Sequence, residues 1–178
     1  MAGFRRFSQA IAEGDGISVI VDVHSVDQAR AAQERGAEAI ALRGLVEGLA
    51  DATELPGIFV GGDSPDEAVR AGADAILLRR IDDDEELPGL YARALELGLD
   101  CVVQVSDEEQ LEQVLELLDP EIFLLSGEDH EAALELLPDV PAGKLAIADV
   151  RGATSDEIAE LERAGVDAVL VGDAPPHP

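Results

Sequence analysis

Short apolar runs alternate with amphipathic stretches along most of this chain, and the joint between the two recurs. At each joint a helical pattern ends at a glycine, and a run of small and aliphatic residues follows. Glycine adopts the left-handed conformation that often ends a helix, and such runs are typical of parallel strands buried on both faces. The joint occurs at 35–42, 71–78, 97–105 and 163–173. Four copies predict a fold built from a repeated αβ unit.

The apolar runs predict eight strands, and these are 17–23, 37–42, 58–61, 74–79, 100–105, 121–125, 145–149 and 166–171. Polar residues that favour helix starts precede several of the helical patterns between them, at 25–28, 64–67, 106–109 and 154–157. An open sheet explains alternating strands and helices, but eight units without an edge strand favour closure. We therefore predict an α/β fold, a compact single-domain (β/α)8 TIM barrel with minimal loops.

The two ends of the chain complete this prediction. We expect one domain over residues 1–178, with an N-terminal helix in 1–16, the barrel in 17–173 and a tail in 174–178. The last predicted strand is not followed by a helical pattern, so the last helix of the barrel is missing. We expect the N-terminal helix to cover the seam between strands eight and one, and the alternative is that it caps the bottom of the barrel.

The charge of the chain narrows the range of partners. It has 39 acidic and 12 basic residues, a net charge of −27. Such a surface repels nucleic acid and anionic membranes, and we expect neither as a partner. The chain contains no apolar run long enough to cross a membrane and no secretory signal, and its single cysteine cannot form an internal disulfide. We expect a cytoplasmic monomer or weak homodimer, with no metal and no cofactor, because histidines and cysteines show no ligand spacing.

Candidate chemistry gathers where the predicted strands end, which is the working face of such barrels. Asp22, His24 and Asp149 are candidates for acid–base catalysis. The candidates for binding phosphate or another anion are Arg43, Arg79, Arg80, Arg151, Gly152 and Gly172. Four of the twelve basic residues thus fall at one end of a very acidic chain. The alternative is that these arginines pair with neighbouring acids and close the barrel.

Four segments resemble the indole-3-glycerol phosphate synthase family, and they are VIVDVHS at 19–25, AGADAILL at 71–78, GLDCVVQVSDEEQL at 98–111 and AGVDAVLVGD at 164–173. The resemblance covers about residues 17–173. It implies a (β/α)8 barrel of tryptophan biosynthesis, a lyase that decarboxylates and cyclises a carboxyphenylamino-deoxyribulose phosphate. It also implies that Gly172 belongs to a phosphate-binding loop.

The chain departs from that family where the chemistry resides. Asp22 and His24 stand where the family has glutamate and lysine, and Gln104 replaces the glutamate of strand five. The only lysine, Lys144, precedes strand seven at the other end of the barrel. Ring closure needs a general acid, and arginine stays charged. We therefore predict a compact scaffold that has lost this activity and binds a small phosphorylated ligand.

Two other functions stay open at this point. One is a lyase or isomerase that acts on a small phosphorylated metabolite with Asp22, His24 and Asp149 as acid and base groups. The other is a non-catalytic interaction module.

Overall fold

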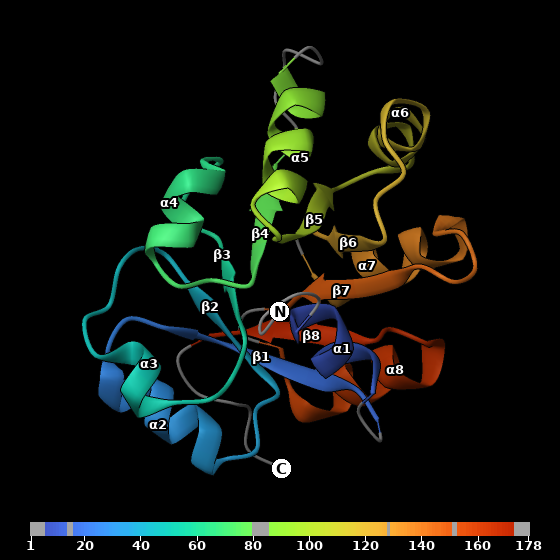
Figure 1. Cartoon of the computed structure of the whole chain (residues 1–178). Helices are drawn as coiled ribbons and strands as arrows, with labels where there is room; N and C mark the ends of the chain where they lie inside the picture. The colour runs from blue at the N-terminus through green and yellow to red at the C-terminus, as the bar shows by residue number, and fades with distance from the viewer. Residues whose placement is uncertain (1–5, 14–15, 80–85, 128, 151–152, 173–178) are drawn as a thin grey trace.

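In the computed structural model, which describes residues 6–13, 16–79, 86–127, 129–150 and 153–172, the chain forms a closed barrel of eight parallel strands. The strands are β1 (Ser18–Val23), β2 (Ala39–Leu42), β3 (Gly57–Phe59), β4 (Ala75–Leu78), β5 (Asp100–Val105), β6 (Ile122–Leu125), β7 (Leu145–Asp149) and β8 (Ala168–Val171). Each strand pairs with the next, and β8 pairs with β1 to close the ring (Figure 1). The predicted (β/α)8 architecture is therefore confirmed.

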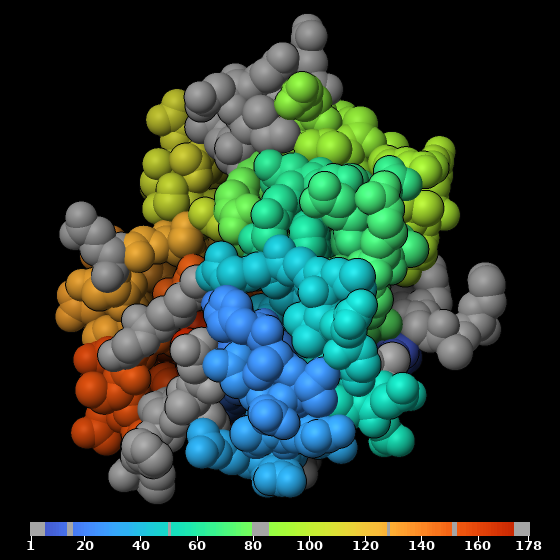
Figure 2. All heavy atoms as spheres, turned by 90° about the vertical axis from the view of Figure 1, so that its left-hand side faces the viewer, coloured from blue at the N-terminus to red at the C-terminus, as the bar shows by residue number. Residues whose placement is uncertain are grey.

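Helices connect the strands and surround the ring. They are α2 (Val26–Glu34), α3 (Leu49–Ala52), α4 (Pro65–Arg70), α5 (Glu86–Glu96), α6 (Glu108–Leu117), α7 (His130–Leu136) and α8 (Ser155–Ala164), with a 3-10 turn at Leu137–Asp139. Figure 2 shows one face of this outer layer, where α2 and α4 lie with the segment that joins them.

Local sequence signals set the ends of these helices. The side chains of Ser25 and Ser64 accept the amides of Gln28 and Glu67, as predicted, and Thr154 forms a complete capping box with Glu157. In the predicted box at 106–109 the capping residue is Asp107. The four glycines of the repeated joint all have positive φ, between 78° and 106°, and they are Gly36, Gly72, Gly98 and Gly165.

Several strand bounds differ from the sequence prediction. β2 and β8 begin two residues later than predicted, at Ala39 and Ala168, and the third strand ends at Phe59 and not at 61. A proline within a helical pattern predicts an interruption, but α5 continues through Pro88 and Gly89. Pro88 causes no break because it stands near the start of α5, where a missing amide proton costs no helical hydrogen bond. Within the described part of the chain, no helix is both long enough and apolar enough to cross a membrane.

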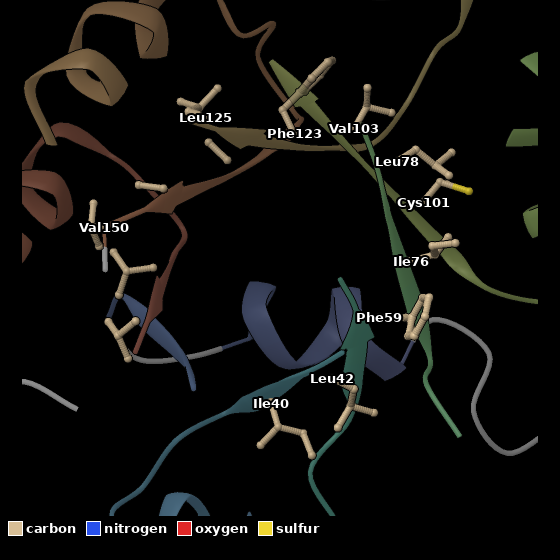
Figure 3. Packing of buried hydrophobic residues seen from close by; sticks show 14 of the residues in the cluster. Ile40, Leu42, Phe59, Ile76, Leu78, Cys101, Val103, Phe123, Leu125 and Val150 are labelled. Carbon is tan, nitrogen blue, oxygen red and sulfur yellow. The ribbon is translucent and has the colours of Figure 1, made fainter. Parts of the chain in front are cut away.

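Buried residues form two shells, one on each face of the barrel wall. The outer shell packs between strands and helices, and in Figure 3 its labelled members, such as Phe59 and Phe123, point away from the centre of the ring. The inner shell fills the barrel with residues such as Ile20, Ile58 and Leu124. Because side chains alternate along a strand, every second residue of each strand joins the inner shell.

The helix α1 (Arg6–Ala12) belongs to the inner shell and not to the seam. Phe7 and Ile11 are 0% and 2% exposed and pack with the inward residues of the strands. The amide of Ser8 donates to Asp100 at the start of β5, and the hydroxyl of Ser18 at the start of β1 donates to the carbonyl of Ile11. The helix therefore closes the end of the barrel where the strands begin, within the outline of the ring (Figure 1). The expected seam position is wrong because β1 and β8 close the seam themselves.

At this same end, acidic residues that precede even-numbered strands hold the starts of odd-numbered strands. Glu38 Oε2 accepts the amide of Val19 at 2.7 Å, and Asp74 Oδ2 accepts that of Gly57 at 3.0 Å. Asp167 Oδ2 accepts the amide of Ala146 at 2.8 Å. We call these three contacts the carboxylate clamps. Burial raises the pKa of Asp167, and its bond from Ala146 opposes that shift.

Candidate functional site at the strand tips

The inner shell ends in a polar layer at the tips of the strands. Each strand has a last apolar residue that points into the barrel. Because side chains alternate, the residue two positions later also points inward, and it lies at the mouth of the barrel where the strands end. The resulting tip ring consists of Asp22, Arg43, Gly62, Arg79, Gln104, Ser126, Asp149 and Gly172. Two arginines and two aspartates make its formal charge zero, although the whole chain carries −27. The eight residues of the ring are thus formally neutral within a strongly acidic protein.

An ion pair between β1 and the end of β2 forms one side of the ring. Arg43 donates from Nε and Nη2 to Asp22 Oδ2 at 3.2 and 3.1 Å. The side chain of Asp22 is only 6% exposed, whereas that of Arg43 is 39% exposed. A fixed guanidinium fork of this kind orients the carboxylate, because two donors share one oxygen.

Gly61 determines where the backbone of Arg43 can lie. A Cβ atom at Gly61 would stand 2.0 Å from the carbonyl oxygen of Arg43, closer than any real contact. The amide of the preceding Val60 donates to the carbonyl of Leu42 at 2.7 Å, which keeps the two strand ends together. The absence of a side chain at Gly61 therefore permits the approach that carries Arg43 to Asp22.

His24 lies on the other side of Asp22. Its Nε2 is 3.7 Å from Asp22 Oδ1, and its side chain is 50% exposed. Its backbone amide donates to Gln28 Oε1 at 2.5 Å, so the first turn of α2 fixes the backbone at this point. The two oxygens of Asp22 thus face two different side chains, with Arg43 at Oδ2 and His24 at Oδ1.

Arg79 occupies the ring at the end of β4 in a different way. Its Nη2 donates to the carbonyl of Val60 at 2.8 Å, and its amide donates to Asp63 Oδ1 at 3.3 Å. In the described parts of the chain, no carboxylate lies within ion-pair distance of its guanidinium. Arg79 is therefore an inward, partly buried cation whose charge is not matched by a described acid.

The other ring members are neutral or acidic. Ser126 donates from its hydroxyl to the carbonyl of Val105 at 3.4 Å, and Asp149 ends β7 in a half-buried position. Gly62 and Gly172 leave open space, since a Cβ atom there would meet nothing within 4 Å. Three predicted anion-binding residues, Arg80, Arg151 and Gly152, lie outside the described residues. The structure therefore brings Asp22, His24 and Arg43 together and places Arg79, Asp149 and Gly172 on the same ring.

Comparison with known proteins connects this barrel to a family. Residues 64–175 match the family model described as indole-3-glycerol phosphate synthase. A synthase of that name from Geobacillus sp. (strain WCH70) is 32% identical over 179 residues, covering 86% of this chain and 68% of the relative. The chain belongs to the indole-3-glycerol phosphate synthase family. It spans 47% of another relative of that name, from Bacillus pumilus (strain SAFR-032), at 36% identity over 117 residues, or 61% of this chain.

Solved structures share the barrel at lower identity. An N-acetylmannosamine-6-phosphate 2-epimerase from Clostridium perfringens superposes with a TM-score of 0.75 at 19% identity, covering 89% of this chain and 87% of the epimerase. A putative phosphonomutase from Burkholderia cenocepacia J2315 gives a TM-score of 0.69 at 17% identity, covering 96% and 92%. These likenesses concern the fold.

Against this synthase framework, the position of the only lysine is informative. Lys144 lies directly before β7, at the end of the barrel opposite the tip ring, and its Nζ pairs with Asp119 at 2.6 Å. The tip ring itself holds neither lysine nor glutamate. Its groups can bind an anion, orient an imidazole and exchange a proton at His24, but they differ from the family's set as the resemblance describes it.

Other reactive groups and cavities lie away from the ring. Burial raises the pKa of the Cys101 thiol to about 12, which makes it a poor nucleophile. Cavities of about 830, 590 and 280 Å³ open on the outside of the barrel or beside α1, and the described residues that line them include no ring member. In the described ranges, no three His, Cys, Asp or Glu side chains form a group that could hold a metal.

Sequence reasoning missed two parts of the site. It placed Gly61 at a strand tip without recognising the contact with Arg43, and it did not foresee that the Val60 carbonyl would hold Arg79. The signal for the first was available, because a glycine at a strand end often marks a close backbone approach. The second depends on a side-chain conformation that no local pattern encodes.

Proposed function

We propose that this chain binds a small phosphorylated molecule at the tip ring and does not perform the ring closure of the synthase family. The observation that carries the proposal is Arg79, a partly buried arginine of the tip ring whose guanidinium contacts the carbonyl of Val60 and no described acid. Arginine has five N–H donors in a planar fork, and one of those of Arg79 is used by the carbonyl of Val60. The remaining donors suit the oxygens of a phosphate group.

The rest of the ring supports a small ligand. The open space beside Gly62 and Gly172 gives room for ligand atoms, and backbone amides at glycines are common phosphate donors in barrels. Gln104 and Ser126 add neutral polar groups that suit hydroxyls. The two arginines of the ring also offset part of the repulsion that a net charge of −27 exerts on an anionic ligand.

The proposed loss of ring closure rests on proton chemistry. The resemblance to the family implies a lysine as its general acid, and the arginines of the tip ring cannot replace it because they remain protonated at any ordinary pH. Lys144 cannot serve because it lies at the opposite end of the barrel, paired with Asp119. We therefore expect binding of phosphorylated ligands without formation of the indole product.

Binding is tested by calorimetric titration with D-ribulose 5-phosphate and with inorganic phosphate at low salt. We expect saturable binding, and we expect Arg79→Gln to weaken it about tenfold or more, as loss of a charged hydrogen bond does. Arg70→Gln is the matched control, because Arg70 ends α4 on the outer surface. Absence of binding at millimolar concentrations of both probes would refute the proposal.

Ring closure is tested with the family's carboxyphenylamino-deoxyribulose phosphate, by following indole fluorescence. We expect no product above the rate without protein. Product formation by the purified chain that Asp22→Ala abolishes would show that the family activity survives, and it would overturn this half of the proposal.

A further inference from the structure

We infer that Asp22 and His24 form a proton-transfer pair at the tip ring, which acts on the carbon beside the carbonyl of a phosphorylated keto sugar. The inference rests on the proposed function, because it requires a phosphorylated ligand bound at the tip ring beside His24. In this pair His24 is the catalytic residue, and Asp22 and Arg43 are positioning residues. Such a pair supports isomerisation and needs no lysine.

The geometry around Asp22 carries the inference. A buried carboxylate within ion-pair distance of an imidazole attracts the protonated ring, as in catalytic pairs where histidine moves the proton. Here Asp22 Oδ1 lies 3.7 Å from His24 Nε2. The Asp22 side chain is 6% exposed and the imidazole is 50% exposed, so the acid is embedded while the base reaches solvent and ligand.

Contacts from the end of β2 and the start of α2 hold this pair in place. Arg43 fixes Oδ2 of Asp22 with two hydrogen bonds, which prevents the carboxylate from turning away from the imidazole. Gln28 holds the backbone amide of His24, and Gln28 is itself fixed because its amide donates to the Ser25 hydroxyl at 3.2 Å. Fixed geometry of this kind is what general acid–base catalysis requires.

The proposed step balances without an added reactant. The imidazole of His24 takes a proton from the carbon beside the carbonyl. The C–H electron pair forms a C=C bond, and the carbonyl π electrons move to oxygen to give an enediolate. Return of the proton from His24 to the neighbouring carbon, with transfer of the hydroxyl proton from one oxygen of the enediolate to the other, completes an isomerisation with no oxidant or reductant.

Proton transfer is tested by NMR in D2O. The measurement follows the replacement by deuterium of a hydrogen on the carbon beside the carbonyl of D-ribulose 5-phosphate. Wild-type protein is expected to exchange this hydrogen faster than buffer alone. General acid–base catalysis contributes about 10²–10⁴-fold, so His24→Gln is expected to lose at least about 100-fold. His130→Gln is the matched control, because His130 begins α7 and contacts Glu157 and Glu160 of α8.

Asp22→Asn separates positioning from binding. Because Asp22 acts through His24, this variant is expected to lower kcat for exchange while leaving KM nearly unchanged. His24→Gln keeps the test valid if Asp22→Asn fails to fold, since His24 is half-exposed.

The outcomes distinguish the two levels of the proposal. Saturable binding without exchange, or exchange that persists in His24→Gln, overturns the proton-transfer pair and leaves the proposed binding intact. Absence of binding overturns the proposed function. If Asp22→Asn lowers kcat/KM only by raising KM, Asp22 takes part in ligand binding, and its positioning role is overturned.

Discussion

At Gly61 the chain leaving β3 passes against the carbonyl of Arg43, where a methyl group would stand 2.0 Å from the oxygen. Gly61→Ala must therefore push the two strand ends apart, and overpacking of this kind costs about 1–3 kcal/mol. We expect that loss in the free energy of unfolding, measured by urea denaturation, together with weaker exchange activity because Arg43 moves from Asp22.

Gly62→Ala is the control for this substitution. A Cβ atom at Gly62 meets nothing within 4 Å, and neither glycine has a positive φ. The two variants add the same methyl group one residue apart. Equal stability of Gly61→Ala and Gly62→Ala would contradict the close approach.

Cys101 offers a prediction about pH. Burial raises its pKa to about 12, above its ordinary value of 9.0. Above pH 9 the unfolded chain loses the thiol proton while the folded chain keeps it, so the free energy of unfolding falls as pH rises. We expect this decline between pH 9 and 12 to be smaller in Cys101→Ala. A thiol-specific reagent at pH 8 should label the native wild type only after denaturation, and rapid native labelling would contradict the burial.

At the scale of single residues, the sequence predicts where a side chain lies better than which groups it contacts. Strand alternation placed Asp22, His24 and Arg43 at the same end of the barrel, and they meet there. It left open whether the arginines bind a ligand or pair with acids. The structure divides them, because Arg43 pairs with Asp22 while Arg79 holds a carbonyl. Side-chain conformation decides that difference, and local sequence does not encode it.

Among the elements, α1 has the most distinctive position, since it closes the strand-start end of the barrel. Phe7 is fully buried among inward residues, and truncation of a buried phenylalanine costs about 3–5 kcal/mol. We expect Phe7→Ala to lower the free energy of unfolding by an amount in that range. Thermal and urea unfolding measure it.

Gln9→Ala serves as the matched variant on the same helix, because Gln9 is exposed. Exposed substitutions usually change stability by no more than about 0.5 kcal/mol. A similarly small effect of Phe7→Ala would show that α1 does not belong to the core.

The position of α1 shows where sequence reasoning stops at this scale. Helical spacing of Phe7 and Ile11 predicted the helix and its buried face. An amphipathic pattern states which face is buried but not what covers it. The two available places were the seam and the bottom, and the direct pairing of β1 with β8 excludes the seam.

For the whole molecule, the net charge of −27 makes the largest long-range electrostatic contribution to stability, and this contribution is unfavourable. Like charges repel one another, and salt shortens the screening length from about 30 Å at 0.01 M to about 3 Å at 1 M. We expect Tm to rise with added NaCl, by about 2–4 °C for each kcal/mol of repulsion removed. The rise should shrink near pH 4, where carboxylates lose charge. A Tm that is independent of salt at pH 7 would contradict this account.

The overall architecture was predictable because the same helix–glycine–strand pattern occurs four times in the sequence. A repeated pattern supports the fold even where the bounds of a single strand are uncertain. The expected monomer or weak homodimer stays a prediction, which sedimentation at several concentrations can test. The ligand was less predictable, since the acids and cations of the tip ring are assembled from strands far apart in sequence, such as Asp22 on β1 and Asp149 on β7.

The carboxylate clamps have a consequence for the order in which the barrel assembles. Each clamp joins residues only 17 to 21 positions apart, from Glu38 to Val19, from Asp74 to Gly57 and from Asp167 to Ala146. Closing a short loop costs less entropy than closing a long one, and local contacts speed folding. Each βαβ pair can therefore form its clamp before distant strands meet. We therefore expect the pairing of β1 with β8, which spans nearly the whole chain, to form last.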